Sequence, residues 1–209
     1  MGHIDLKRVA DRFPTIYITL ISVLLAIAME DTVSQLRDGE AGDWFNWAIA
    51  FYVGMTSFSA WTGYSFVAIV QQRRPRLLDS VNVFAIAAGM IAINTTIDQA
   101  HFWFFFSVAI YCLIAIYAIY YNFNMLGEAA PYELQFRDWA VCLFQPLPYF
   151  FIYAPLAWLA YQGALDPEVE IAFAYFALTQ PATWAVLFYH AWKRVLDHAA
   201  QVQAGKVTV

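Results

Sequence analysis

Charged residues are scarce in this chain of 209 residues, because only 13% of them are Asp, Glu, Lys or Arg. A soluble domain averages about 25% charged and about 45–50% apolar residues, whereas 62% of this sequence is hydrophobic. A soluble protein of this length has too much surface to hide so many apolar side chains. The composition therefore excludes an ordinary soluble fold and indicates a protein whose solvent is the lipid bilayer.

Cysteine is also rare, and the sequence lacks the common catalytic motifs. Cys112 and Cys142 lie in apolar stretches without a CxxC spacing or a histidine companion, which predicts neither a zinc site nor a disulfide framework. No Gly-rich phosphate loop, HExxH motif or serine-nucleophile elbow is present, so no catalytic residue is predicted. The net charge of −5 argues against nucleic acid as a partner, since such a partner requires a broad basic face.

Six long apolar runs account for the composition. Most of them reach the roughly 20 residues that a helix needs to cross about 30 Å of hydrocarbon. The runs are continuous and do not alternate with period two, which favours helices over a membrane barrel. We therefore predict one all-α domain over residues 1–209, a polytopic membrane bundle with six transmembrane helices. The predicted spans are residues 14–30, 44–71, 77–94, 100–126, 139–161 and 171–193.

Positive charge is distributed unevenly between the two sides that these spans define. Ten of the eleven Lys and Arg residues fall on one side, and only Arg37 falls on the other, which carries most of the acids. Because cytoplasmic loops are enriched in Lys and Arg, both termini are predicted to be cytoplasmic, in a bacterial-type inner or plasma membrane. This bias requires the third run, which contains Asp79, to cross fully. A re-entrant third segment would move Lys193 and Arg194 to the outside.

Polar residues form one stripe on the first predicted span. Thr15, Thr19, Ser22 and Glu30 recur at intervals that place them on one helical face. One interpretation is the wall of a permeation path, with Glu30 and Asp31 forming an acidic mouth that concentrates cations. The other is helix packing, because Ser and Thr allow close approach and bond to the preceding turn. The sequence leaves both open.

Small residues and prolines mark predicted contact and bending points. Small residues let membrane helices approach closely, although they also suit the lining of a narrow pore. Proline removes an N–H and pushes the helix away from the preceding carbonyl, which predicts kinks. The predicted packing residues are Gly63, Ala85, Ala88, Gly89 and Ala92, and the predicted kinks are at Pro146, Pro148, Pro155 and Pro181.

Two glutamines lie beside these prolines. Gln180 precedes Pro181 near the middle of the sixth span, and Gln145 precedes Pro146 in the fifth. A broken helix beside polar groups at mid-membrane is how many transporters build a substrate site. A structural kink with its glutamine bonded to a neighbouring helix is the alternative. We therefore take Gln145 and Gln180 as candidate pathway residues.

Histidines and aromatic residues bear on possible cofactors. His101 starts the fourth span at the outer face and His190 ends the sixth at the inner face, so depth excludes a haem shared between them. Asp98 and His101, three residues apart, suit an interfacial pair better than a metal site. Neither a cofactor nor a metal is predicted. The aromatic block at residues 102–106 is a candidate contact surface for lipid, quinone or pigment.

The absence of a charge at mid-membrane bears on function. Proton-coupled transporters and pumps usually need such a charge, so we predict a passive channel or facilitator for an ion or small solute. The alternative is a non-catalytic structural or accessory subunit of a larger membrane complex, contacting lipid, quinone or pigment. A third reading is an intramembrane redox protein or enzyme, although we predict no enzyme. The predicted partners are the lipid bilayer and either further copies in a homo-oligomer or a membrane-complex partner.

Overall fold

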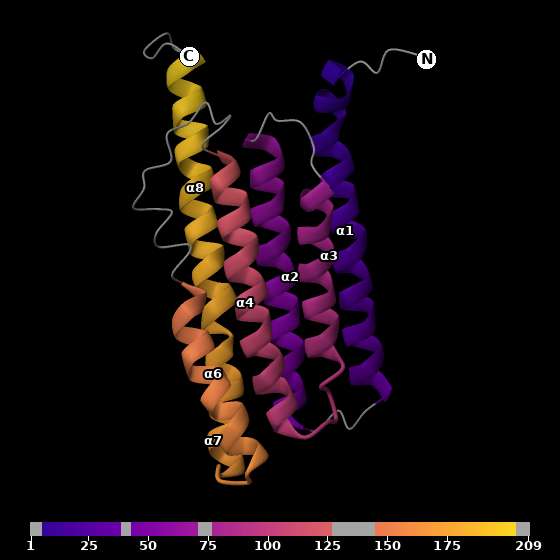
Figure 1. The fold of residues 1–209 in the computed structure, drawn as a ribbon, viewed down its shortest axis with the longest axis vertical. Helices are drawn as coiled ribbons and strands as arrows, with labels where there is room; N and C mark the ends of the chain where they lie inside the picture. The colour runs from indigo at the N-terminus through magenta and orange to yellow at the C-terminus, as the bar shows by residue number, and fades with distance from the viewer. Residues whose placement is uncertain (1–5, 39–42, 71–76, 127–144, 204–209) are drawn as a thin grey trace.

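The described part of the chain is helical. A computed structural model of the protein describes residues 6–38, 43–70, 77–126 and 145–203, and these residues include no β-strand. The helices run side by side along one axis, as Figure 1 shows. They are α1 (Leu6–Asp38), α2 (Trp44–Val70), α3 (Leu77–Asn94), α4 (His101–Leu126), α6 (Pro146–Tyr161), α7 (Pro167–Ala177) and α8 (Thr179–Gln203).

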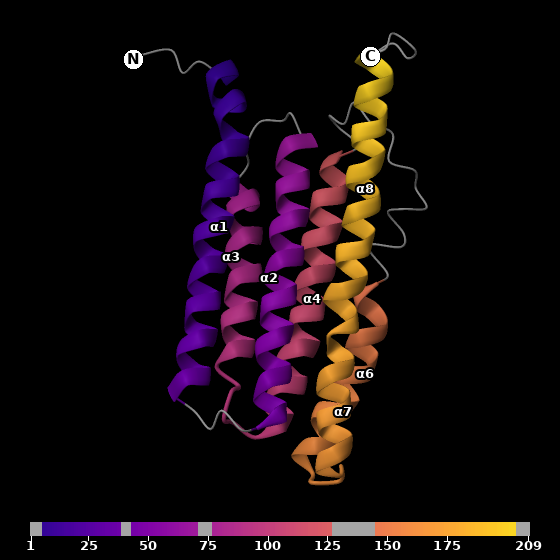
Figure 2. The ribbon, with the colours of Figure 1, turned by 180° about the vertical axis from the view of Figure 1, so that it is seen from behind.

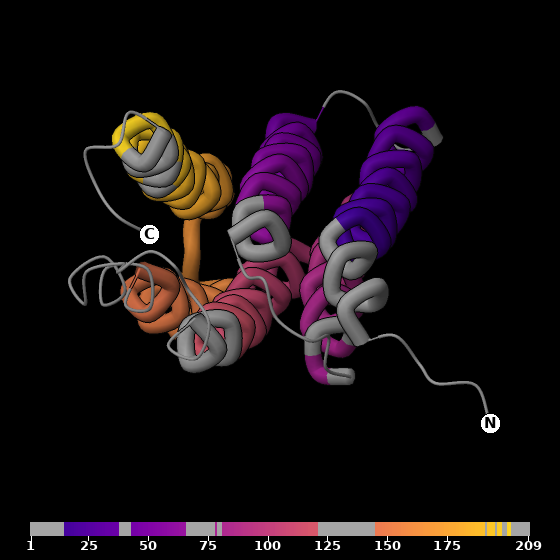
Figure 3. The backbone as a smooth tube through the Cα atoms, turned by 90° about the horizontal axis from the view of Figure 1, so that it is seen from above, coloured from indigo at the N-terminus to yellow at the C-terminus, as the bar shows by residue number. Residues whose placement is uncertain are grey.

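Two rows of helices make up the bundle when it is seen along its axis (Figure 3). One row holds α1, α2 and α8, and the other holds α3, α4 and α6. Neighbours within each row are in contact, and α3 joins the rows by packing on both α1 and α2. Seen from behind, α1 and α3 lie at one edge and α6 and α8 at the other (Figure 2). The start of α1 and the end of α8 lie at the same end of the bundle (Figure 1).

The local sequence explains where several helices begin and end. The Asp43 carboxylate accepts the backbone N–H two residues later at 2.9 Å, at the start of α2. Asp166 accepts the N–H two residues later at 3.2 Å and is followed by Pro167, whose ring suits the first helical position of α7. After α6, Gly163 has a φ of 65°, a left-handed conformation that ends the helix at no steric cost to glycine.

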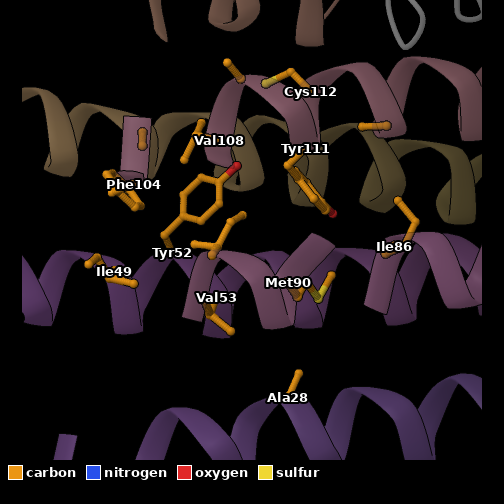
Figure 4. Close-up of a cluster of buried hydrophobic side chains, with 14 of the residues drawn as sticks. Ala28, Ile49, Tyr52, Val53, Ile86, Met90, Phe104, Val108, Tyr111 and Cys112 are labelled. Carbon is orange, nitrogen blue, oxygen red and sulfur yellow. The ribbon is translucent and has the colours of Figure 1, made fainter. Parts of the chain in front are cut away.

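Large side chains fill the space between the rows. Tyr52 and Val53 of α2 and Met90 of α3 are completely buried. Figure 4 shows Tyr52 reaching from α2 toward the part of α4 that carries Val108, with Tyr111 of α4 and Met90 nearby. One cluster of buried residues draws on α1, α2, α3, α4, α6 and α7. Side-chain packing therefore fills the described interior of a single copy.

Three helices are long and apolar enough to cross a membrane. Among the described residues these are Thr15–Arg37, His101–Tyr120 and Pro167–Arg194, and Val81–Asn94 is a shorter apolar helix. α2 has 27 residues and is not among these candidates. The all-α prediction is confirmed for the described residues, and three helices are candidate membrane spans.

The helices in the second half of the chain differ from the predicted spans. Residues 139–144 of the predicted fifth span lie outside the described residues, and α6 begins at Pro146. The predicted sixth span is divided, because α7 ends at Ala177 and α8 begins at Thr179 and continues to Gln203. Pro181 explains the break, since it has no N–H to donate to the carbonyl of Ala177.

Candidate functional site

The break between α7 and α8 places a polar side chain inside the bundle. Gln180 is only 2% exposed, and the adjacent Pro181 is also buried. The glutamine amide has two N–H donors and an oxygen with two lone pairs. Burying such a group costs free energy unless hydrogen bonds replace those lost to solvent. The hydrogen-bond partners of Gln180 therefore decide whether this position is tolerable.

Side chains from neighbouring helices bond to Gln180. The Tyr52 hydroxyl of α2 donates to Gln180 Oε1, and Gln180 Nε2 lies 3.5 Å from Cys112 Sγ of α4. Gln145 Nε2, just before α6, donates to the Gln180 backbone carbonyl at 3.1 Å. Trp184 Nε1, one turn further along α8, donates to Gln145 Oε1. We call Tyr52, Cys112, Gln145, Gln180 and Trp184 the Gln180 node.

The break itself is bonded from both rows. Ser59 Oγ of α2 donates to the Pro181 carbonyl at 2.9 Å. On the other side, the Tyr149 hydroxyl of α6 lies 2.8 Å from Thr179 Oγ1, which also bonds the carbonyl of Phe176 at 2.7 Å. Side chains of α2 and α6 therefore hold the first turn of α8 in place where the regular helical ladder is interrupted.

All five side chains of the Gln180 node are uncharged at neutral pH. They are a phenol, a thiol, an indole and two primary amides. Amides and hydroxyls can donate to or accept from a neutral polar solute, but they bring no fixed charge to balance an ion. The node therefore offers hydrogen-bonding groups without a fixed charge.

A second polar group, the end cluster, lies where α1 and α3 end and α4 and α7 begin. Asn94 Nδ2 donates to Asp31 Oδ2 at 2.6 Å and so joins α3 to α1. His101 Nδ1 lies 2.5 Å from Glu170 Oε2 and joins α4 to α7, and its ring stacks on Phe45 with centroids 3.7 Å apart. These bonds tie the ends of separate helices together.

The turn between α3 and α4 belongs to the same cluster. Asp98 has a φ of 60°, a left-handed conformation that is uncommon for a residue with a side chain. Asn46 stabilises it, because Asn46 Nδ2 donates to Asp98 Oδ1 at 2.6 Å and the Asp98 N–H donates to Asn46 Oδ1 at 3.2 Å. Within the described ranges, no group of three or more His, Cys, Asp or Glu residues is placed to hold a metal ion.

The predicted polar stripe of α1 faces away from the core. Thr15, Thr19 and Glu30 are exposed, and the half-buried Ser22 accepts the Trp61 indole N–H at 3.0 Å. The Thr19 and Ser22 hydroxyls each donate to the carbonyl four residues earlier, at 2.8 and 2.7 Å. A path along this stripe therefore requires a neighbouring chain to close it, and its role in permeation stays a prediction.

The predicted packing residues fall into two groups. A Cβ added to Gly63 would lie 2.4 Å from the Phe188 ring of α8, and one added to Gly89 would lie 2.9 Å from the Tyr111 ring of α4. These two glycines therefore sit at close contacts between helices. The other three residues lie toward the outer side of α3, half-buried or exposed, and are Ala85, Ala88 and Ala92.

The four prolines occupy different environments. Pro146 is buried at the first position of α6, where a missing N–H has no cost. Pro148 and Pro155 are exposed, and α6 continues through Pro155. Only Pro181 accompanies a visible interruption between two described helices.

The structure brings Gln145 and Gln180 together, while their other partners were not recognised in the sequence. Trp184 follows Gln180 by four residues, which places both on one side of α8. Tyr52 precedes Ser59 by seven residues and so shares a face of α2 with it. These two spacings are the features of the sequence that could have indicated which residues share a helix face with the node. The partnership of His101 with Glu170 had no such signal, because 69 residues separate them.

Comparisons with known proteins identify no relative of this chain. No protein family, curated protein or solved structure matches it. The residues of the Gln180 node and the end cluster are therefore the basis for a functional proposal.

Proposed function

We propose that this protein is a passive membrane facilitator for a small neutral polar solute, and that the Gln180 node gates the solute path. The chain forms one domain that crosses a bacterial-type inner or plasma membrane six times, with both termini in the cytoplasm. The proposal narrows the range of ions and solutes that the sequence allows, because the node offers hydrogen bonds without fixed charge.

Several features support the membrane location. In the part of the chain that the structure describes, three helical segments are long and apolar enough to cross a bilayer. Large apolar side chains are exposed on the outside of the bundle, among them Ile16, Phe58, Phe151 and Val186 at 56–68% exposure. Water penalises such surface and hydrocarbon does not. The first residues of α1 and the last of α8 share one end of the bundle, as an even number of crossings requires (Figure 1).

The Gln180 node is the observation that carries the proposed function. It gathers polar side chains from α2, α4, α8 and the start of α6 around one buried amide. Helices broken beside polar groups are a recurring way to build solute sites inside membranes. The node's groups bond to one another here, and a solute with a hydroxyl or amide would exchange bonds with them at small net cost.

Passage requires this node to open, because packed side chains fill the interior around it. Tyr52, Phe104 and Tyr153 are each 0% exposed. The break between α7 and α8 is the natural place for movement, since the helical ladder is already interrupted there. When the node opens, its side chains would exchange their hydrogen bonds with one another for hydrogen bonds to the solute. Such an opening needs no charged residue at mid-membrane.

Solute flux into liposomes tests the proposal. Purified protein is reconstituted, and entry of glycerol or urea is followed by stopped-flow light scattering. We expect Gln180→Leu to reduce the protein-dependent rate at least fivefold, because it removes the amide at the centre of the node. Gln201→Leu is the matched control, since Gln201 is exposed near the end of α8. Folded wild-type protein that carries neither solute would refute the proposal.

A second candidate is a subunit of a larger membrane assembly, either a homo-oligomer or a complex with other chains. The specific observation is that Thr15, Thr19 and Glu30 lie on the exposed side of α1. Polar side chains on the outer side of a membrane helix favour contact with a neighbouring chain. Native mass spectrometry from mild detergent would separate a lone chain, a symmetric oligomer and a fixed mixed complex.

A further inference from the structure

A hollow of about 310 Å³ opens on the outer side of α2, next to α8. Five of its lining residues come from α2 and one comes from α8. The hollow lies beside the start of α8 and therefore close to the break that the Gln180 node holds. Its lining residues are Phe51, Gly54, Met55, Phe58, Ser59 and Ala185.

The hollow exists because two bulky side chains flank two small residues. Phe51 and Phe58 are seven residues apart on one helical face, which separates them by about 10.5 Å along the axis. Gly54 contributes no side chain between them, and Ala185 contributes only a methyl group. A Cβ on Gly54 would meet nothing nearer than Met29 Cε at 3.8 Å, so close helix packing does not require this glycine.

The lining defines the chemistry of the ligand. Phe51 and Phe58 are 51% and 63% exposed, so their rings are available on the outer side of the bundle. The single polar side chain in the lining, Ser59, already donates its hydrogen to the Pro181 carbonyl at 2.9 Å. The hollow thus offers no free hydroxyl hydrogen to a ligand. It suits a ligand segment that is wholly apolar.

We propose that this hollow binds one acyl chain of a membrane lipid. This inference rests on the membrane location within the proposed function and not on solute passage. α2 lies between α1 and α8 (Figure 3), and these neighbours carry the candidate spans Thr15–Arg37 and Pro167–Arg194. Within a membrane, the outer side of α2 therefore faces hydrocarbon. A flexible acyl chain follows the slot between the two phenylalanine rings and gains dispersion contacts with both.

Binding there connects the surrounding lipid to the Gln180 node. The acyl chain packs against Ser59, and the Ser59 hydroxyl donates to the Pro181 carbonyl in the first turn of α8. Ser59 is only 5% exposed, so this bond is already buried, and an acyl chain in the hollow adds a packing contact on its outer side. The lipid supports the closed arrangement of the break from outside the bundle.

Photocrosslinking tests the acyl-chain site. The protein is placed in phosphatidylcholine nanodiscs that contain a small fraction of a phospholipid with a diazirine in its acyl chain. Crosslinked residues are then mapped by peptide mass spectrometry. We expect labelling of residues 51–59 to exceed labelling of the exposed side of α3 at least fivefold. This enrichment should be lost in Ala185→Phe, which fills the hollow, and in Phe58→Ala, which removes one wall.

Ala88→Phe is the control, because Ala88 is exposed on α3, which does not line the hollow and belongs to the other row of helices (Figure 3). It should leave the enrichment at residues 51–59 unchanged. Labelling spread evenly over all exposed apolar residues, or enrichment that persists in both hollow variants, would overturn the proposal. The readout needs no solute flux, so this site and the facilitator function can fail independently.

Discussion

Replacing Tyr52 by Phe removes one hydroxyl from the middle of the bundle and leaves the ring in place. Tyr52 is completely buried, and its hydroxyl donates to Gln180 Oε1. Gln180→Leu removes the partner amide and keeps a side chain of similar size. Each single substitution leaves a buried polar group with one bond fewer, which costs about 1–3 kcal/mol in the free energy of unfolding.

The double variant Tyr52→Phe/Gln180→Leu loses both partners at once. Its loss in the free energy of unfolding should therefore be smaller than the sum of the two single losses. Such coupling energies in a helical membrane protein average about 0.6 kcal/mol and reach about 1.7 kcal/mol. Because this pair is fully buried, we expect about 1 kcal/mol. Reversible unfolding of the four proteins in mixed micelles, with increasing dodecyl sulfate, measures it.

A coupling energy below about 0.3 kcal/mol is what separated, non-interacting residues give, and it would refute the hydrogen bond between Tyr52 and Gln180. Tyr120→Phe provides the control, because Tyr120 is 54% exposed on α4. Combined with Gln180→Leu, it should show simple additivity. A large coupling energy for this control would mean that the measured free energies reflect a non-specific loss of stability of the bundle and not a particular hydrogen bond.

Three further substitutions or labels test other contacts. Gly63→Val should destabilise the bundle by about 1–3 kcal/mol through overpacking against an α8 aromatic ring, whereas Gly54→Ala should change its unfolding midpoint little. In a Cys142→Ala background, a water-soluble methanethiosulfonate should label Cys112 when the solute path opens; no labelling while solute crosses would contradict a path through the node. Glu170→Gln removes the carboxylate that pairs with an α4 histidine and should cost about 1–3 kcal/mol in chemical unfolding. An unchanged midpoint would mean that this pair does not hold α7 to α4.

The sequence predicts the helical class well, because long apolar runs leave few other structures. The starts of α2, α3 and α4 lie within one residue of the predicted spans at 44, 77 and 100. Hydropathy does not predict where a helix stops in the interfacial region, and α1 extends beyond residues 14–30 at both ends. The split at Leu178 lies three residues before Pro181, since proline disrupts the turn that precedes it.

The candidate site was only partly visible in the sequence. Gln145 and Gln180 could be selected because polar residues beside prolines in apolar runs are unusual. Their contact could not be predicted, since it depends on how α6 and α8 pack across the two rows. The outward position of Thr15 and Thr19 was equally hidden, because a stripe on one helix face does not reveal whether that face meets the core or the surroundings.

α8 begins directly after the interruption at Leu178, so a rotation at that residue would move the whole helix. The 25 residues of α8 extend about 37 Å from Leu178 at 1.5 Å per residue. A swing of about 10° there would carry the far end of α8 sideways by about 6 Å, over that same length of helix. Because the start of α1 lies at that same end of the bundle, a pair of probes on the two helices would read a small rearrangement deep in the molecule as a large change in separation.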